Sequence, residues 1–107
     1  MKNDPLKIWK GHTGPILDIC TNPQGSLVFS ASRDKTMRTW DVVSGQHIQK
    51  FTGHTGSVQT VVATSNGVAI TGSSDQTMKK WCLDSATCLG TFPNLVKVSI
   101  TTTSFFG

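Results

Sequence analysis

His12, Ser30 and Asp34 have the residue types of a catalytic triad. In a triad the histidine removes the serine proton while the carboxylate orients the imidazole. Ser30, however, lies between Phe29 and Ala31, and a nucleophilic serine of an α/β hydrolase sits in a Gly-x-Ser-x-Gly turn. We therefore expect these three side chains to have a structural role, with no catalytic residue among them.

The recurrence of these residue types supports the structural interpretation, because an active site is needed only once. A tryptophan completes each set, which gives His12, Ser30, Asp34 and Trp40, and then His54, Thr71, Asp75 and Trp81. An indole N–H only donates, a hydroxyl and an imidazole do both, and a carboxylate accepts. Each set is therefore able to form one chain of hydrogen bonds, a structural tetrad that ties a loop to a later tight turn.

His12, His54 and the cysteines do not indicate a metal site. No pair of them has ligand spacing such as C-x-x-C or H-x-x-x-H, so we expect no metal and no cofactor. Cys82 and Cys88 could face each other across a hairpin as a disulfide, but we prefer to interpret them as small core residues. We read all three cysteines, Cys20 included, as reduced thiols. His47 is alone on a predicted outer strand, where we expect solvent exposure.

The composition favours short strands over helices. The 107 residues include 15 Thr, 11 Ser and 10 Gly but no Glu, so strong helix formers are scarce. There is no apolar run long enough to cross a membrane and no apolar core of a signal peptide, which predicts a cytoplasmic or nuclear protein. The net charge of +4 is scattered along the chain and does not by itself indicate nucleic acid.

Longer segments of the chain are repeated at a nearly constant interval. Gly11-His12-Thr13-Gly14 returns as Gly53-His54-Thr55-Gly56, and the segment 32–40 returns as 73–81. Turn signals divide each unit into four short strands. The predicted strands are 16–21, 27–32, 37–42 and 47–51, then 58–63, 68–73, 78–83 and 87–92. The apolar residues predicted to fill the space between units are Ile16, Ile19, Val28, Met37, Val58, Val61, Val68, Ile70 and Met78.

The order of Gly-His, Ser-x-Asp and Trp-Asp resembles the WD-repeat β-propeller family, although Trp81-Cys82 departs from the name-giving dipeptide. The resemblance implies an all-β fold with two four-stranded antiparallel blades, a partial propeller over 1–92. Blade one is 11–52 and blade two is 53–92. Residues 6–10 are expected to be the outer strand of a preceding or closing blade. The divergent tail 93–107 contains strand-like residues 95–103, which could start a further blade.

The resemblance also implies a non-enzymatic scaffold that binds other proteins or peptides through its loop face. The candidate contact residues are Thr13, Arg33, Lys35, Thr55 and Ser74. A propeller has four to eight blades, so a two-blade chain is expected to be a fragment or shortened form, and to self-associate or pair with the missing blades. The alternatives are an RNA- or other nucleic-acid-associated module, against which the scattered charge argues, and a truncated product with no autonomous function.

Overall fold

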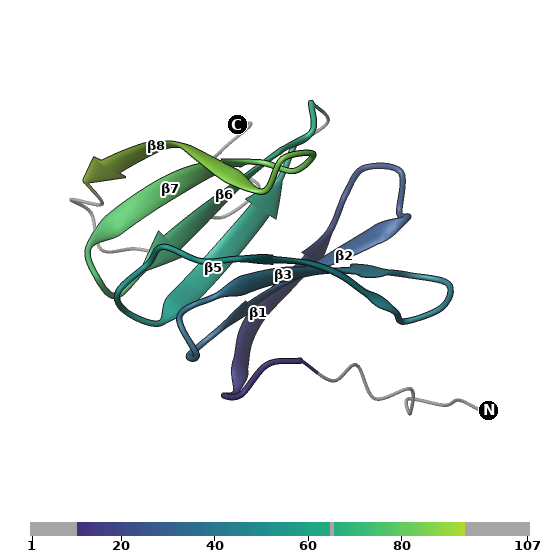
Figure 1. Cartoon of the computed structure of the whole chain (residues 1–107), viewed down its shortest axis with the longest axis horizontal. Helices are drawn as coiled ribbons and strands as arrows, with labels where there is room; N and C mark the ends of the chain where they lie inside the picture. The colour runs from purple at the N-terminus through teal and green to yellow at the C-terminus, as the bar shows by residue number, and fades with distance from the viewer. Residues whose placement is uncertain (1–10, 65, 94–107) are drawn as a thin grey trace.

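The structure, a computed structural model, describes residues 11–64 and 66–93 of the chain. This part contains eight strands and no helix (Figure 1). The strands are β1 (Ile16–Thr21), β2 (Leu27–Ser32), β3 (Met37–Asp41), β4 (His47–Phe51), β5 (Val58–Ala63), β6 (Val68–Ser73), β7 (Thr77–Cys82) and β8 (Thr87–Pro93). The predicted strands are confirmed to within one residue at each end. The expected strand 6–10 and the strand-like segment 95–103 lie outside the described residues.

The strands form two four-stranded sheets in the orders β1-β2-β3-β4 and β5-β6-β7-β8. Every pairing is antiparallel and joins strands that are consecutive in sequence. The two sheets lie side by side, with β5 of the second sheet against β1 and β2 of the first (Figure 1). The predicted all-β class with two antiparallel sheets is therefore confirmed.

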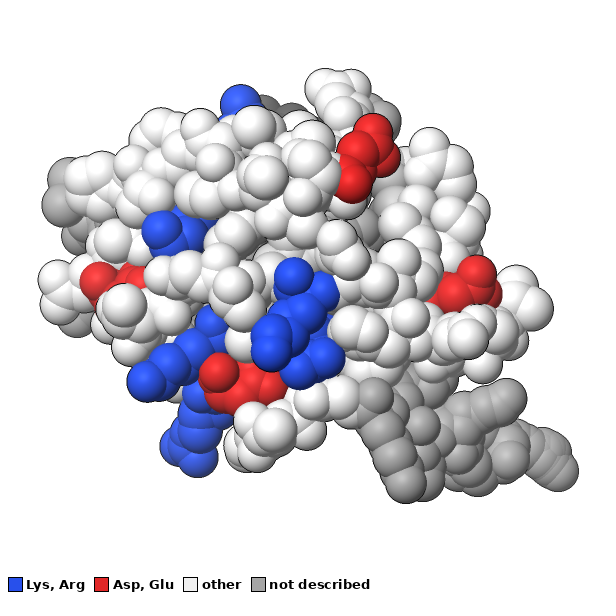
Figure 2. All heavy atoms as spheres, viewed as in Figure 1, with Lys and Arg blue, Asp and Glu red and all other residues white. Residues whose placement is uncertain are grey.

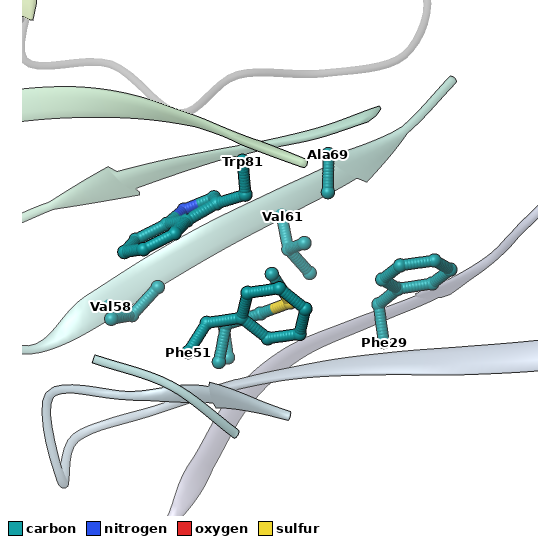
Figure 3. Close-up of a cluster of buried hydrophobic side chains, with 8 residues drawn as sticks. Phe29, Phe51, Val58, Val61, Ala69 and Trp81 are labelled. Carbon is teal, nitrogen blue, oxygen red and sulfur yellow. The ribbon is translucent and has the colours of Figure 1, made fainter. Parts of the chain in front are cut away.

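The hydrophobic core lies between the two sheets. Phe29, Ala31, Met37 and Phe51 extend from the first sheet, and Val58, Val61, Ala69 and Trp81 from the second (Figure 3). The rings of Phe51 and Trp81 meet edge to face, with centroids 5.7 Å apart, a favoured geometry for aromatic pairs. Each sheet contributes one side to this core, so the sheets stabilise each other.

Two of the predicted apolar core positions are wrong. Ile16 and Ile19 are 47% and 62% exposed. Ile19 pairs with Ser30 as Val61 pairs with Thr71 one repeat later, yet Val61 is buried because the first sheet covers it. No strand within 11–64 and 66–93 covers the equivalent side of the first sheet. Val28, Met37, Val58 and Val61 are buried as predicted, and Val68, Ile70 and Met78 are half-buried.

The cysteines are all free thiols, as expected. Cys82 pairs in register with Thr87, and Cys88 lies opposite Trp81, so the two cysteines are not directly opposed. The core interpretation is wrong for Cys88, which is exposed, while Cys20 and Cys82 are half-buried. Burial raises the pKa of Cys20 to about 11, and its sulfur therefore stays a neutral thiol at physiological pH.

Candidate functional site

The first tetrad forms a continuous hydrogen-bonded chain. His12 precedes β1, and its Nδ1 lies 2.7 Å from Asp34 Oδ2 in the β2–β3 turn. Its Nε2 lies 2.6 Å from the Oγ of Ser30 in β2. Trp40 in β3 donates its indole N–H to the same Oγ at 2.8 Å. Because a carboxylate only accepts, the Nδ1–H of His12 donates to Asp34 Oδ2, and Nε2 pairs with the Ser30 hydroxyl.

The second tetrad repeats this arrangement with threonine in place of serine. His54 Nδ1 lies 2.9 Å from Asp75 Oδ2, and His54 Nε2 lies 2.7 Å from Thr71 Oγ1. The Trp81 indole N–H donates to Thr71 Oγ1 at 2.9 Å. His54, Thr71 and Trp81 are buried. Burial lowers the pKa of His54, and the bond to Asp75 offsets this only in part, so the neutral imidazole is favoured.

Each turn aspartate also fixes the backbone around it. The Asp34 carboxylate accepts from the backbone N–H of Thr13 at 3.0 Å and of Thr36 at 2.9 Å. Ser32 adds a further brace, because its Oγ accepts from Asp34 N at 3.0 Å and donates to the carbonyl of Pro15 at 2.9 Å. The hydroxyl of Thr36 also donates to the Asp34 carboxylate. Sequence reasoning missed the supporting roles of Ser32 and Thr36. The recurrence of these two residues as Ser73 and Thr77 was the available signal.

Acid is expected to weaken the fold through this carboxylate. Burial acts to raise the pKa of Asp34, but hydrogen bonds from Thr36, His12 and Thr13 outweigh it and lower the pKa to about 2. A lowered folded-state pKa stabilises the fold above the unfolded value of 3.8. That contribution is lost as the pH falls from about 4 toward 2. The urea midpoint should therefore decline over this window.

The matched variant Asp34→Asn distinguishes the effect of protonating Asp34 from the effect of acid on the rest of the chain. Asparagine keeps an acceptor oxygen but has no charge to titrate. We expect Asp34→Asn to be less stable than the parent at neutral pH and to lose less of its stability between about pH 4 and pH 2. If the urea midpoints of the parent and the variant fall equally over this pH range, Asp34 does not contribute to the acid sensitivity of the fold.

The five candidate contact residues are all exposed and lie in loops at the strand ends. Thr13 and Arg33 belong to neighbouring loops, since Arg33 N donates to Pro15 O at 3.0 Å. Thr55 and Ser74 are placed in the same way in the second sheet, where Ser74 N donates to Ser57 O at 2.9 Å. Lys35 occupies the β2–β3 turn with φ of 78°. Figure 2 shows several basic side chains over the lower part of the molecule, around an acidic residue.

Gly56 allows the second of these loop pairs to approach closely. A Cβ at this position would lie 2.5 Å from Ser74 Oγ and 2.8 Å from the Asp75 backbone nitrogen. We expect Gly56→Ala to lower the unfolding free energy by about 1–3 kcal/mol, because backbone must move to relieve the overlap. Gly14→Ala is the matched variant in the first sheet, where the nearest atom would be 3.2 Å away. Urea denaturation should rank Gly56→Ala as the more damaging of the two.

His47 is exposed, as expected, but it is not isolated. Its Nε2 accepts from Arg38 Nη1 at 3.0 Å, and its ring meets Trp40 edge-on with centroids 5.0 Å apart. Partial burial lowers its pKa, and the positive charge of Arg38 lowers it further. The neutral form that accepts from arginine is therefore favoured.

The described residues hold no group of three His, Cys, Asp or Glu side chains placed to bind a metal ion. Within the same part of the chain, no helix is long and apolar enough to cross a membrane.

Comparison with known proteins identifies the repeat unit. The family model described as "WD domain, G-beta repeat" matches residues 3–41 and 45–82. Eukaryotic translation initiation factor 3 subunit I of Meyerozyma guilliermondii is 32% identical over 89 residues, covering 82% of this chain and 25% of that protein. The mRNA export factor of Danio rerio is 50% identical over 50 residues, covering 47% and 13%. Mitochondrial division protein 1 of Mycosarcoma maydis is 41% identical over 73 residues, covering 67% and 9%.

The chain thus spans about a quarter of the length of the initiation factor subunits that it matches. The family model covers most of the chain, and its two matches contain the two tetrads and seven of the eight strands. The chain belongs to the WD-repeat family.

Proposed function

We propose that this chain is a non-enzymatic protein-interaction module that receives a protein or peptide on its exposed loops. The proposal rests on one observation: at the strand ends some polar groups are paired with one another, and others are exposed. The polar groups of the tetrads are engaged with one another, whereas the adjacent side chains Thr13, Arg33, Lys35, Thr55 and Ser74 are exposed. A braced backbone that presents exposed side chains binds with little loss of conformational entropy.

The geometry of Ser30 argues against hydrolysis. Its Oγ is bonded to His12 and to the Trp40 indole, and the residue is 2% exposed. A nucleophile needs a free path to the substrate and a nearby oxyanion site. The structural-tetrad role fits these facts better, because a buried polar group must be paired to be tolerated.

The relatives fit the same proposal. Their names describe a subunit of a translation initiation factor and an mRNA export factor. We propose that this chain, too, works within a protein assembly. We also propose that it is located in the cytoplasm or the nucleus. Fold membership alone does not specify a partner.

Arg33 is the residue to test first. It is exposed beside the turn aspartate, and arginine is enriched among residues that dominate binding energy. We expect Arg33→Ala to weaken binding of the partners captured by the tagged full chain by about tenfold or more. Lys80→Ala is the control, since Lys80 is an exposed cation on β7 away from the turns. Equal capture by the parent and both variants, in quantitative pull-downs, would remove Arg33 from the interface.

An RNA-associated role is the second candidate, favoured by the two cations Arg33 and Lys35 on one exposed turn. Phosphate contacts make binding fall steeply with salt. A single-stranded RNA probe titrated at two salt concentrations separates the candidates. Salt-sensitive RNA binding that Arg33→Ala and Lys35→Ala both weaken would favour the RNA-associated role. If the chain does not bind RNA, the protein-interaction role is the remaining candidate. A truncated product without function would show neither protein capture nor RNA binding.

A further inference from the structure

The two sheets share their tetrads but differ where their last two strands pair. Arg38 of β3 lies in register with Lys50 of β4, and the equivalent pair one repeat later is Lys79 with Thr91. Lys79 Nζ donates to Thr91 Oγ1 at 2.9 Å, which is a favourable cross-strand contact. Arg38 and Lys50 instead place like charges directly opposite each other, and such a pair is destabilising. Because the second sheet forms without this pair, the fold of a blade does not require it.

His47 adds a third basic group to this pair. Its Nε2 accepts from Arg38 Nη1 at 3.0 Å, and its ring packs edge-on against Trp40. Arg38 and Trp40 are alternate residues of β3 and share one side of the sheet, and Lys50 shares that side through its register with Arg38. In the second sheet Cys88 occupies the position of His47. Three basic side chains, here called the basic cluster (Arg38, His47 and Lys50), therefore gather on one side of the first sheet.

Arg38 is held in place with hydrogen-bonding capacity to spare. A guanidinium carries several N–H donors in a planar fork, and within residues 11–64 and 66–93 the Arg38 group bonds to His47 alone. Its Nε is buried without a hydrogen-bond partner, which costs stability. Gly11 packs closely on the same side chain, since a Cβ there would lie 3.1 Å from Arg38 Nη1. His47 and Lys50 are exposed, so a ligand can reach the cluster from solvent.

The basic cluster has no neutralising carboxylate within the part of the chain that the structure describes. The ion pairs found there join the histidine and the aspartate of each tetrad. Partial burial lowers the pKa of His47. The positive charges of Arg38, His12 and Lys50 lower it further. An anion placed among these groups would offset their mutual repulsion.

We propose that Arg38, His47 and Lys50 bind a doubly charged phosphate group, either free phosphate or a phosphate monoester. A phosphorylated serine carries a charge of about −1.5 to −2 near pH 7 and three acceptor oxygens, which suits two fixed cations and one titratable group. The guanidinium fork matches the geometry of phosphate oxygens. A phosphodiester carries a single charge and suits the cluster less well. The site lies on β3 and β4, and it does not depend on the loop surface proposed above.

Binding of the phosphate should be coupled to a proton on His47. Nε2 of the neutral ring accepts from Arg38, whereas both nitrogens of a protonated imidazole are donors. Uptake of a proton at Nε2 therefore ends that bond and leaves His47 and Arg38 both able to donate to the anion. A nearby negative charge favours the protonated imidazole. Phosphate should thus raise the pKa of His47.

Nuclear magnetic resonance of the full chain tests both effects. The ring protons of His47 report its pKa, and the amides of β3 and β4 report binding. Inorganic phosphate and phosphoserine with blocked termini should both bind and raise the pKa of His47, and sodium chloride at equal ionic strength should do neither. Tighter binding of phosphoserine would assign the site to a phosphorylated partner, and tighter binding of inorganic phosphate to a small phosphate compound. Sulfate, which stays doubly charged throughout, should also raise the pKa of His47.

Matched variants separate the cluster from net charge. Arg38→Gln and Lys79→Gln remove one positive charge from equivalent positions of the two sheets. Arg38→Gln should weaken phosphate binding at least about tenfold, and Lys79→Gln by less than about twofold. Lys50→Ala changes an exposed residue and should weaken binding about threefold or more. Circular dichroism shows that each variant remains folded.

Three results would overturn the proposal. The first is a pKa of His47 that phosphate raises no more than chloride does. The second is equal phosphate affinity in Arg38→Gln and Lys79→Gln, because binding would then follow net charge alone. The third is a single-stranded RNA that binds more tightly than phosphoserine and loses affinity in Arg38→Gln, which would make a nucleic acid the ligand of the basic cluster.

Discussion

Replacing Phe51 with alanine should lower the unfolding free energy by about 3–5 kcal/mol. Phe51 is 1% exposed on β4 and belongs to the cluster that joins the two sheets. Its ring meets Trp81 edge to face at 5.7 Å. Truncation removes the apolar contacts and the aromatic pair and leaves a cavity between the sheets. Urea denaturation, followed by tryptophan fluorescence, measures the loss.

Ile48→Ala is the matched control because it truncates another large apolar residue of the same strand. Ile48 is 48% exposed, so its replacement should cost no more than about 0.5–1 kcal/mol. The two variants differ mainly in burial. Similar urea midpoints for Phe51→Ala and Ile48→Ala would mean that the interface between the sheets does not stabilise the chain.

The size of this effect also bears on cooperativity. Each sheet buries apolar side chains mainly against the other, as Phe51 does against Val58 and Trp81. Repeat units of this kind stabilise their neighbours, and total stability is a sum of unit and interface contributions. Loss of the Phe51 contact should therefore weaken β5–β8 as well as β1–β4, and hydrogen exchange in both sheets should accelerate together.

The strands could be predicted from the sequence because turn residues separate them at regular intervals. Asp34 and Asp75 mark equivalent β2–β3 and β6–β7 turns, and both turns contain a residue with positive φ, Lys35 and Gln76. Such turns are specified locally by side chains that bond their own backbone. The strand ends followed from these signals, and the structure shifts them by only one residue.

The environment of the inner strands was harder to predict, because it depends on what lies beside each sheet. Ile19 and Val61 occupy equivalent positions and have similar side chains, yet among residues 11–64 and 66–93 only Val61 meets another sheet. The contact between Asp18 and Val61 joins residues 43 apart, and no local pattern predicts it. Sequence periodicity predicts which residues share one face of a strand. What packs against that face is decided by the tertiary structure.

The tetrads were easier to predict from the sequence than the surroundings of the inner strands, and harder to predict than the strands themselves. The repeated residue types predicted which side chains bond to one another, because donors and acceptors could be matched by residue type. The sequence did not predict how closely Ser32 and Thr36 support Asp34, since both read as ordinary turn residues. Their contribution depends on Asp34 being held against the loop that carries Thr13.

Thr71→Val should be the second most damaging change, lowering the unfolding free energy by about 2–4 kcal/mol. Valine has nearly the same shape as threonine, so packing is kept and only the hydroxyl is lost. The Trp81 indole N–H and His54 Nε2 both bond to that hydroxyl, at 2.9 Å and 2.7 Å. Thr71 is fully buried, and water does not replace the lost partner without a cavity to occupy. Two buried polar groups are therefore left unpaired by one substitution.

Thr71→Ser tests whether the hydroxyl is the cause. Serine keeps the oxygen that the first tetrad uses at Ser30, which accepts from Trp40 at 2.8 Å. We expect Thr71→Ser to lose only the methyl contribution, about 1 kcal/mol. The indole N–H proton of Trp81 should keep its chemical shift in Thr71→Ser and move in Thr71→Val. If the Thr71→Val and Thr71→Ser variants are equally stable, hydrogen bonding through Thr71 does not brace the second sheet. The tetrads would then lack the structural role proposed for them. The proposed function of the exposed loops depends on that role.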